Sequence, residues 1–177
     1  MSRPLTPFPL LTVVAATLLT VAMAAPSAPA QTPAHRHSLP LQGDVSTPGG
    51  DVFNIDGTFT PRAVDVTAGE LVLLGSFDGA LTSGGGAATR VTTGDTLLPV
   101  TGASSPACDA LEVDPSVLLI DSLGVRSESS QVLLELRPDE APSTLIDGLC
   151  RLVATLQGVA DYSIDAMVPE LNQELRP

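Results

Sequence analysis

The two cysteines, Cys108 and Cys150, are the residues whose type and number point most clearly to a chemistry. An even number of cysteines in an exported chain is typical of a disulfide, so we predict a bond between them. A redox-active or metal-binding pair is the alternative. The wide separation, the absence of a C-x-x-C motif and the lack of a neighbouring histidine stand against it.

Other potential metal ligands are scattered. His35 and His37 could bind a metal ion only weakly, and we expect both in a solvated tail. Three acidic residues carry the oxygens that calcium prefers, but none lies in a D-x-D-x-D-G loop, so solvated strand faces are the expected positions for Glu112, Asp114 and Asp121. We predict no metal site and no cofactor.

The chain offers few groups for catalysis. A Ser-His-Asp triad would require one of the two tail histidines, and neither a G-x-S-x-G nor an H-E-x-x-H motif is present. The glycines at 84–86 lack the Lys and following helix of a phosphate-binding loop. A pair of carboxylates could still hydrolyse a glycosidic bond, but the chain has no Trp, one Tyr and only 4 Phe for stacking on sugars. We predict no catalytic residue.

The first thirty residues have the pattern of a secretory signal peptide. Arg3 supplies a positive charge, residues 10–25 are uncharged, and 28–30 (Ala-Pro-Ala) form a small-x-small cleavage motif. We expect the mature chain to begin at Gln31, with cleavage after Ala24 as the alternative. An uncleaved anchor is disfavoured because the apolar run is shorter than the roughly 20 residues that a spanning helix needs. The expected location is secreted, periplasmic or cell-surface.

The charge balance restricts the partners. The chain carries 8 Lys and Arg against 20 Asp and Glu, a net charge of −12. Binding to nucleic acid or to anionic lipid depends on clustered basic side chains, so we expect no nucleic-acid partner. We also expect no transmembrane segment once the signal is removed. An apolar small molecule and an envelope protein both remain open as partners.

Alternating apolar residues predict several antiparallel strands after residue 50. Gly57-Thr58-Phe59-Thr60 and Gly75-Ser76-Phe77-Asp78 are alike, which predicts neighbouring strands that each place a Gly beside a Phe on the buried face. Glycine inside a strand marks a bend or a close approach, so the sheet should be curved and could close into a barrel. We expect strands at 53–60, 63–66 (continuing or restarting after Pro61), 71–81, 91–100 and 131–136, and a hairpin turn at 67–70.

The apolar period changes after Pro142 and predicts one C-terminal amphipathic helix at about 144–157. Ser143 or Thr144 can cap its start, and Gly158 can end it. Because Cys150 lies on the flank of the apolar stripe, its sulfur can reach the sheet. On the solvated side, Arg151 follows Asp147 by four residues, a spacing that allows a weak ion pair.

These elements predict an α+β, mainly β fold in which one helix packs on a curved antiparallel sheet. A single domain is expected at 51–160, after a flexible lead-in at 31–50 that is rich in Pro, Ser, Thr and Gly. The remainder, 161–177, should be a tail or a short helix opened by Pro169.

Several of these stretches together resemble a group of exported bacterial proteins of unknown function. The similarity rests on G-T-F-T (57–60), G-E-L-V-L-L-G-S-F-D-G-A-L-T (69–82), C-D-A-L-E-V-D (108–114), L-I-D-S-L-G-V (119–125) and S-T-L-I-D-G-L-C-R-L (143–152). The resemblance implies export and a pair of cysteines of which the second lies in a Leu-rich helix. It implies no catalytic or ligand-binding residue.

We therefore expect an exported, acidic, disulfide-bonded module of the bacterial envelope that binds rather than catalyses. The first alternative is a periplasmic or secreted carrier of an apolar ligand such as a lipid, since glycines on the inner sheet face could leave room for one. Of the two interpretations of these glycines, we favour the one in which they merely let the helix pack closely. The second alternative is a carboxylate-based hydrolase.

Overall fold

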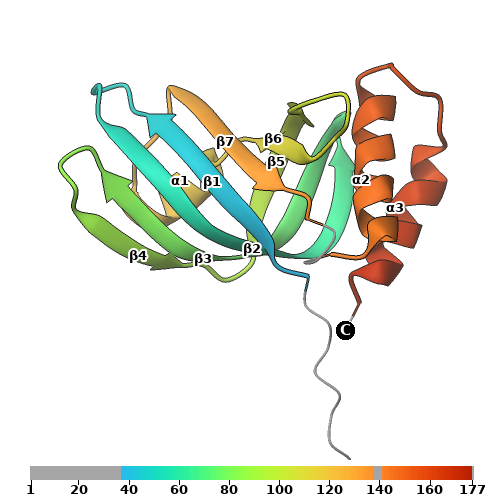
Figure 1. Ribbon diagram of the computed structural model, residues 1–177, viewed down its shortest axis with the longest axis horizontal. Coiled ribbons are helices and arrows are strands. Elements are labelled where there is room, and N and C mark those ends of the chain that lie inside the picture. The colour runs from blue at the N-terminus through green and yellow to red at the C-terminus, as the bar shows by residue number, and fades with distance from the viewer. Residues whose placement is uncertain (1–36, 138–140, 177) are drawn as a thin grey trace, which may run out of the picture. The chain divides into compact units, whose positions relative to one another are not determined.

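The computed structural model describes residues 37–137 and 141–176. Of these residues, 45% lie in strands and 24% in helices. The antiparallel strands close into a six-stranded barrel with one additional strand, and helices pack against it (Figure 1). The predicted α+β, mainly β fold is therefore confirmed, and the curved sheet closes. The predicted signal peptide at 1–30 lies outside the described residues.

The barrel is an up-and-down arrangement in which strands adjacent in the chain are mostly adjacent in space. Its strands follow the order β1-β2-β3-β5-β6-β7, and β7 pairs with β1 to close the circle. β4 pairs with β3 outside this circle. The elements are β1 (Leu39–Ser46), β2 (Val52–Thr67), β3 (Glu70–Ser83), β4 (Ala88–Thr92), β5 (Thr96–Ala103), β6 (Ala110–Val113), α1 (Ser116–Leu123), β7 (Ser129–Glu135), α2 (Ser143–Leu156) and α3 (Ile164–Glu174).

The hairpin of β2 and β3 joins the two longest strands of the barrel. β2 continues through Pro61 because the pairing register shifts between Pro61 and Ala63, so the chain does not restart there. The hairpin turn predicted at 67–70 is confirmed. Its two central residues, Ala68 and Gly69, have φ values of 55° and 84°, the left-handed conformation that matches the twist of a two-residue hairpin.

On the edge that does not face β2, β3 changes partner half-way along its length. Residues 71–75 pair with β5, and residues 78–82 pair with β4. Thr93 joins the two ladders: its N–H donates to the Phe77 carbonyl (2.8 Å), and its Oγ1 accepts from the Phe77 N–H (2.9 Å). The single strand predicted at 91–100 is thus two strands, because the chain bends at Gly94 and Asp95 between them.

Phenylalanine rings fill the barrel interior above the strand glycines. Phe59 and Phe77 are paired across β2 and β3 and are fully buried. A Cβ atom on Gly75 would lie 2.8 Å from the Phe59 ring, and Cβ atoms on Gly79 and Gly57 would lie 2.5 and 2.7 Å from the Phe77 ring. The predicted Gly and Phe pairing is confirmed. These glycines make room for the rings, and not for a packing helix.

β1 overturns part of the predicted flexible lead-in at 31–50. Within the described part of that segment, Leu39, Leu41 and Val45 are fully buried in the barrel. The alternation of large buried side chains is interrupted at Gly43, where a side chain would overlap the backbone of β7. The prediction failed because this glycine, with the prolines around it, resembles loop composition, although it allows close strand contact.

α1 lies between β6 and β7 and is seen behind β1 and β2 in Figure 1. It contains the apolar run at 117–120, which shows no helical period. Leu118 and Leu119 are fully buried against the interior, and Gly124, with φ 67°, ends the helix in a left-handed conformation.

α2 confirms the helix predicted at about 144–157. Its start has no side-chain cap, so neither Ser143 nor Thr144 plays the predicted role, and Pro142 occupies the N-cap position. Figure 1 shows α2 standing beside one end of the barrel. The buried stripe that faces the core consists of Leu145, Leu149, Leu152 and Val153.

α3 is the second C-terminal helix and stands beside α2 (Figure 1). It begins at Ile164, and Pro169 lies inside it, so the prediction that Pro169 opens a helix was wrong. Apolar residues at spacings of three and four hold α3 against the core, and this packing outweighs the local effect of the proline. These residues are Ile164, Met167, Val168, Leu171 and Leu175.

Candidate functional site

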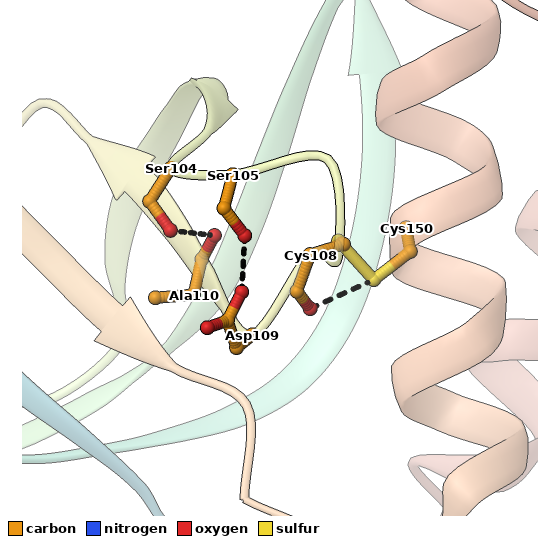
Figure 2. Close-up of a disulfide and its surroundings, with 6 residues drawn as sticks. All are labelled: Ser104, Ser105, Cys108, Asp109, Ala110 and Cys150. Atoms are coloured by element: carbon orange, nitrogen blue, oxygen red, sulfur yellow. Dashed lines mark hydrogen bonds between the residues drawn. A yellow bond between two sulfur atoms is a disulfide. The ribbon is translucent and has the colours of Figure 1, made fainter.

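The predicted disulfide is present. Cys108 lies in the loop between β5 and β6, and Cys150 lies in α2, with their Cα atoms 5.9 Å apart (Figure 2). This separation is typical of disulfides. The bond therefore attaches α2 to the barrel.

Hydrogen bonds shape the loop that presents Cys108. Both the N–H and the Oγ of Ser104 donate to the Ala110 carbonyl at 3.0 Å, and the Cys108 N–H donates to the Ser105 carbonyl at 3.0 Å. The Ser105 hydroxyl also donates to the Asp109 carboxylate (Figure 2), and this bond lowers the pKa of Asp109. Cys108 itself has a positive φ of 53°.

Asn172 provides a second attachment, between α3 and the barrel. Its side-chain amide accepts a hydrogen bond from the Val64 N–H and donates one to the Val64 carbonyl, both at 2.8 Å. β1 pairs with β2 only as far as Phe59, so Val64 lies on an unpaired part of the strand edge. Asn172 thus takes the place of a neighbouring strand there.

A groove of about 380 Å³ lies between the outward faces of α2 and α3. Each helix contributes residues at positions i, i+3, i+4 and i+7, the spacing of a single helix face. The helices can approach closely because a Cβ atom on Gly148 would lie only 2.5 Å from Leu171 Cδ2. The facing residues are Thr144, Asp147, Gly148 and Arg151 on α2, and Met167, Glu170, Leu171 and Glu174 on α3.

The groove combines an apolar floor with an acidic rim. Leu171 is buried and Met167 half-buried, whereas the carboxylates of Asp147, Glu170 and Glu174 are exposed. Within residues 37–137 and 141–176, none of these three carboxylates takes part in an ion pair. The groove therefore carries negative charge that the neighbouring side chains do not neutralise.

Among the described residues that line the groove, Arg151 is the one cation, and it interacts with a ring. Its guanidinium carbon lies 5.8 Å from the centre of the Tyr162 ring, within the range of a cation–π contact. The ion pair that its spacing from Asp147 allowed is not formed. Tyr162 is 48% exposed and precedes α3, so its ring forms one wall of the groove.

The other potential metal ligands in the described residues do not come together. Glu112 is exposed on β6 and Asp121 is exposed on α1, whereas Asp114 accepts hydrogen bonds from the Ser116 N–H and Oγ at 2.9 and 2.5 Å. Among the described residues, no three His, Cys, Asp or Glu side chains could hold a metal ion together. His37 lies just before β1, and His35 lies outside the described residues.

Another hollow, polar and of about 420 Å³, lies beside β4 and α1. Two residues on its wall, Thr96 and Ser122, have buried hydroxyls without a hydrogen-bond partner among the described residues. Buried hydroxyls of this kind are commonly satisfied by an internal water molecule. We therefore assign no ligand to this hollow.

Sequence reasoning missed most of the groove. It placed Asp147 and Arg151 on the solvated side of a helix but assigned them no function, and it did not find Met167, Glu170 or Glu174. The signal available in the sequence was that the groove residues before and after Tyr162 recur at spacings of three and four. The groove could be found only once both stretches were known to be neighbouring helices.

Comparison with models of known families, with characterised proteins and with solved structures finds no match to this chain. In the part of the chain that the structure describes, no helix has the length and apolar character needed to cross a bilayer.

Proposed function

We propose that this chain is an exported, disulfide-stabilised module that acts by binding a partner on its outer surface. The observation that carries the proposal is the contrast between a filled interior and an open exterior. Phe59 and Phe77 occupy the space above the strand glycines. By contrast, the groove between α2 and α3 is open to solvent, and its carboxylates form no ion pair with any residue that the structure describes.

Export is supported by two features. The N-terminal thirty residues have the charge, apolar run and small-x-small motif of a signal peptide, and a structural disulfide is typical of proteins that fold outside the cytoplasm. The motif similarity to exported bacterial proteins agrees with this location.

The two alternative functions receive less support. A lipid inside the barrel would have to displace fully buried rings. A hydrolase of the glycosidase type needs a carboxylic acid with a raised pKa, whereas among the described residues hydrogen bonds from Arg90 and Ser105 lower the pKa values of Asp78 and Asp109. Binding at the surface therefore remains the best-supported function.

Expression of the full chain in a bacterium, followed by cell fractionation and intact mass spectrometry, tests the proposal. We expect an oxidised protein that begins at Gln31 outside the cytoplasm. Native mass spectrometry of the same sample should show no retained lipid. A chain that stays in the cytoplasm with residues 1–30 attached would overturn export, and a stoichiometric lipid would overturn surface binding in favour of the carrier.

A further inference from the structure

We propose that the groove between α2 and α3 binds a basic, amphipathic peptide segment of another protein. This inference rests on the proposed function and names its partner class. The groove joins an apolar floor at Met167 and Leu171 to a rim of three exposed carboxylates. A segment that offers both apolar and basic side chains matches the two parts together.

The charges of the groove favour a cationic partner. Asp147, Glu170 and Glu174 have no ion-pair partner in the described chain, and Arg151 is engaged with a ring. A basic side chain entering the groove would gain this attraction without breaking an existing ion pair. A second copy of this chain fits poorly, because it carries a net charge of −12 and the same acidic rim.

The ring of Tyr162 offers a further contact for a cation. The chain's own Arg151 shows that a guanidinium can lie over this ring, at 5.8 Å from its centre. The groove volume of about 380 Å³ is at the small end of ligand sites. It can therefore accept a few side chains of a short segment, and not a folded domain.

The composition of the chain supplies a direct measurement. Tyr162 is the only tyrosine, and the chain contains no tryptophan, so its ultraviolet fluorescence reports on the groove alone. The probe is a short acetylated and amidated peptide of Leu, Ala and Arg in helical amphipathic spacing, titrated into the oxidised mature protein. We expect a saturable change in Tyr162 fluorescence with this peptide. The matched peptide that has Glu in place of Arg should leave the fluorescence unchanged.

Charge-neutral variants separate the groove from the overall acidity. In D147N/E170Q/E174Q, the peptide affinity should fall about tenfold, since three exposed ion pairs of ordinary strength are lost. The matched control D51N/D56N/E128Q removes three exposed charges from the barrel side and should change the affinity less than about twofold. Equal melting temperatures of the variants would confirm that both remain folded.

Several results would overturn the proposal. These are an absent fluorescence response, equal weakening of peptide binding in the two triple variants, or competition by spermidine as strong as that of the peptide. The spermidine result would count because spermidine has cationic groups but no apolar side chain. Concentration-dependent fluorescence without peptide would indicate self-association instead. None of these outcomes would contradict export or a barrel interior without a lipid, which fractionation and native mass spectrometry test separately.

Discussion

The barrel and the C-terminal helix pair are held in place by different means. In the barrel, six strands form a continuous hydrogen-bonded circle around an apolar interior. The helix pair is joined to it by apolar stripes on α2 and α3 and by two discrete attachments, the Cys108–Cys150 disulfide and the Asn172 amide. The barrel is thus held by a closed backbone ladder, whereas the helix pair is held by side-chain packing and two discrete attachments.

This difference explains where a binding surface can arise. Every strand of the barrel must keep its alternation, because a change of register moves all its side chains to the opposite face. The outward faces of α2 and α3 carry no such constraint once their attachments are fixed. Charged residues such as Glu170 and Glu174 can occupy them without a packing cost.

The largest predicted effect tests the filled interior of the barrel. Phe77→Ala should lower the free energy of unfolding by about 4 kcal/mol, because it empties the space above Gly57 and Gly79. Chemical denaturation measures this change. Phe53→Ala is the matched control, since Phe53 is only half-buried, and its effect should be clearly smaller. Equal losses in the two variants would show that the Phe77 ring does not fill the interior.

The second prediction concerns the covalent attachment of the helix pair. The variant C108S/C150S should lose about 3 kcal/mol of unfolding free energy. Amide hydrogen exchange should accelerate more in α2 and α3 than in β2 and β3, because the barrel ladder stays intact. Wild-type protein under reductant serves as the control and should behave like the variant. Identical unfolding of oxidised and reduced protein would contradict a structural role for the bond.

The third prediction concerns the non-covalent attachment. Asn172→Ala removes two hydrogen bonds to the Val64 backbone, and we expect a loss of about 1 to 2 kcal/mol. Faster exchange of the Val64 amide should accompany it. Gln173→Ala, on the exposed neighbouring residue, should leave the Val64 amide protected. If the Val64 amide exchanges at the same rate in both variants, Asn172 does not take the place of a strand.

The sequence predicted well where side chains carry a clear period. β2, β3 and β7 alternate, and α2 repeats its leucines every three or four residues. The likeness of the two Gly and Phe stretches predicted the pairing of Phe59 with Phe77. The disulfide followed from the number and compartment of the cysteines, since no other pairing was possible within the chain.

The sequence failed where a local signal opposed the tertiary contact. Gly43 and Pro169 are typical of loops and helix starts, yet the structure places them inside β1 and α3 because their neighbours pack on the core. α1 is too short for its apolar run to show a helical period. The groove depends on the neighbouring positions of two helices, and no local pattern encodes that contact.

The smallest predicted effect lies on the outer barrel surface, where charges contribute least. Arg90 donates to the Asp78 carboxylate at 3.2 and 3.3 Å, and Thr92 donates at 3.1 Å. These bonds, led by the one from Arg90, hold the pKa of Asp78 below its ordinary value of 3.8. Because the folded pKa is lowered, the stabilisation is present above the ordinary value and is lost as pH falls through the lowered one.

NMR titration of the Asp78 carboxyl group measures this pKa directly. Arg90→Gln should raise it toward the ordinary value, whereas the control Arg126→Gln, at an exposed position away from Asp78, should leave it unchanged. The Arg90 side chain is 80% exposed, so solvent screens the pair and the melting temperature at neutral pH should hardly change. A large loss of stability in Arg90→Gln would contradict the contrast between the barrel and the helix pair. The β3–β4 surface would then depend on a single ion pair, just as the helix pair depends on its disulfide.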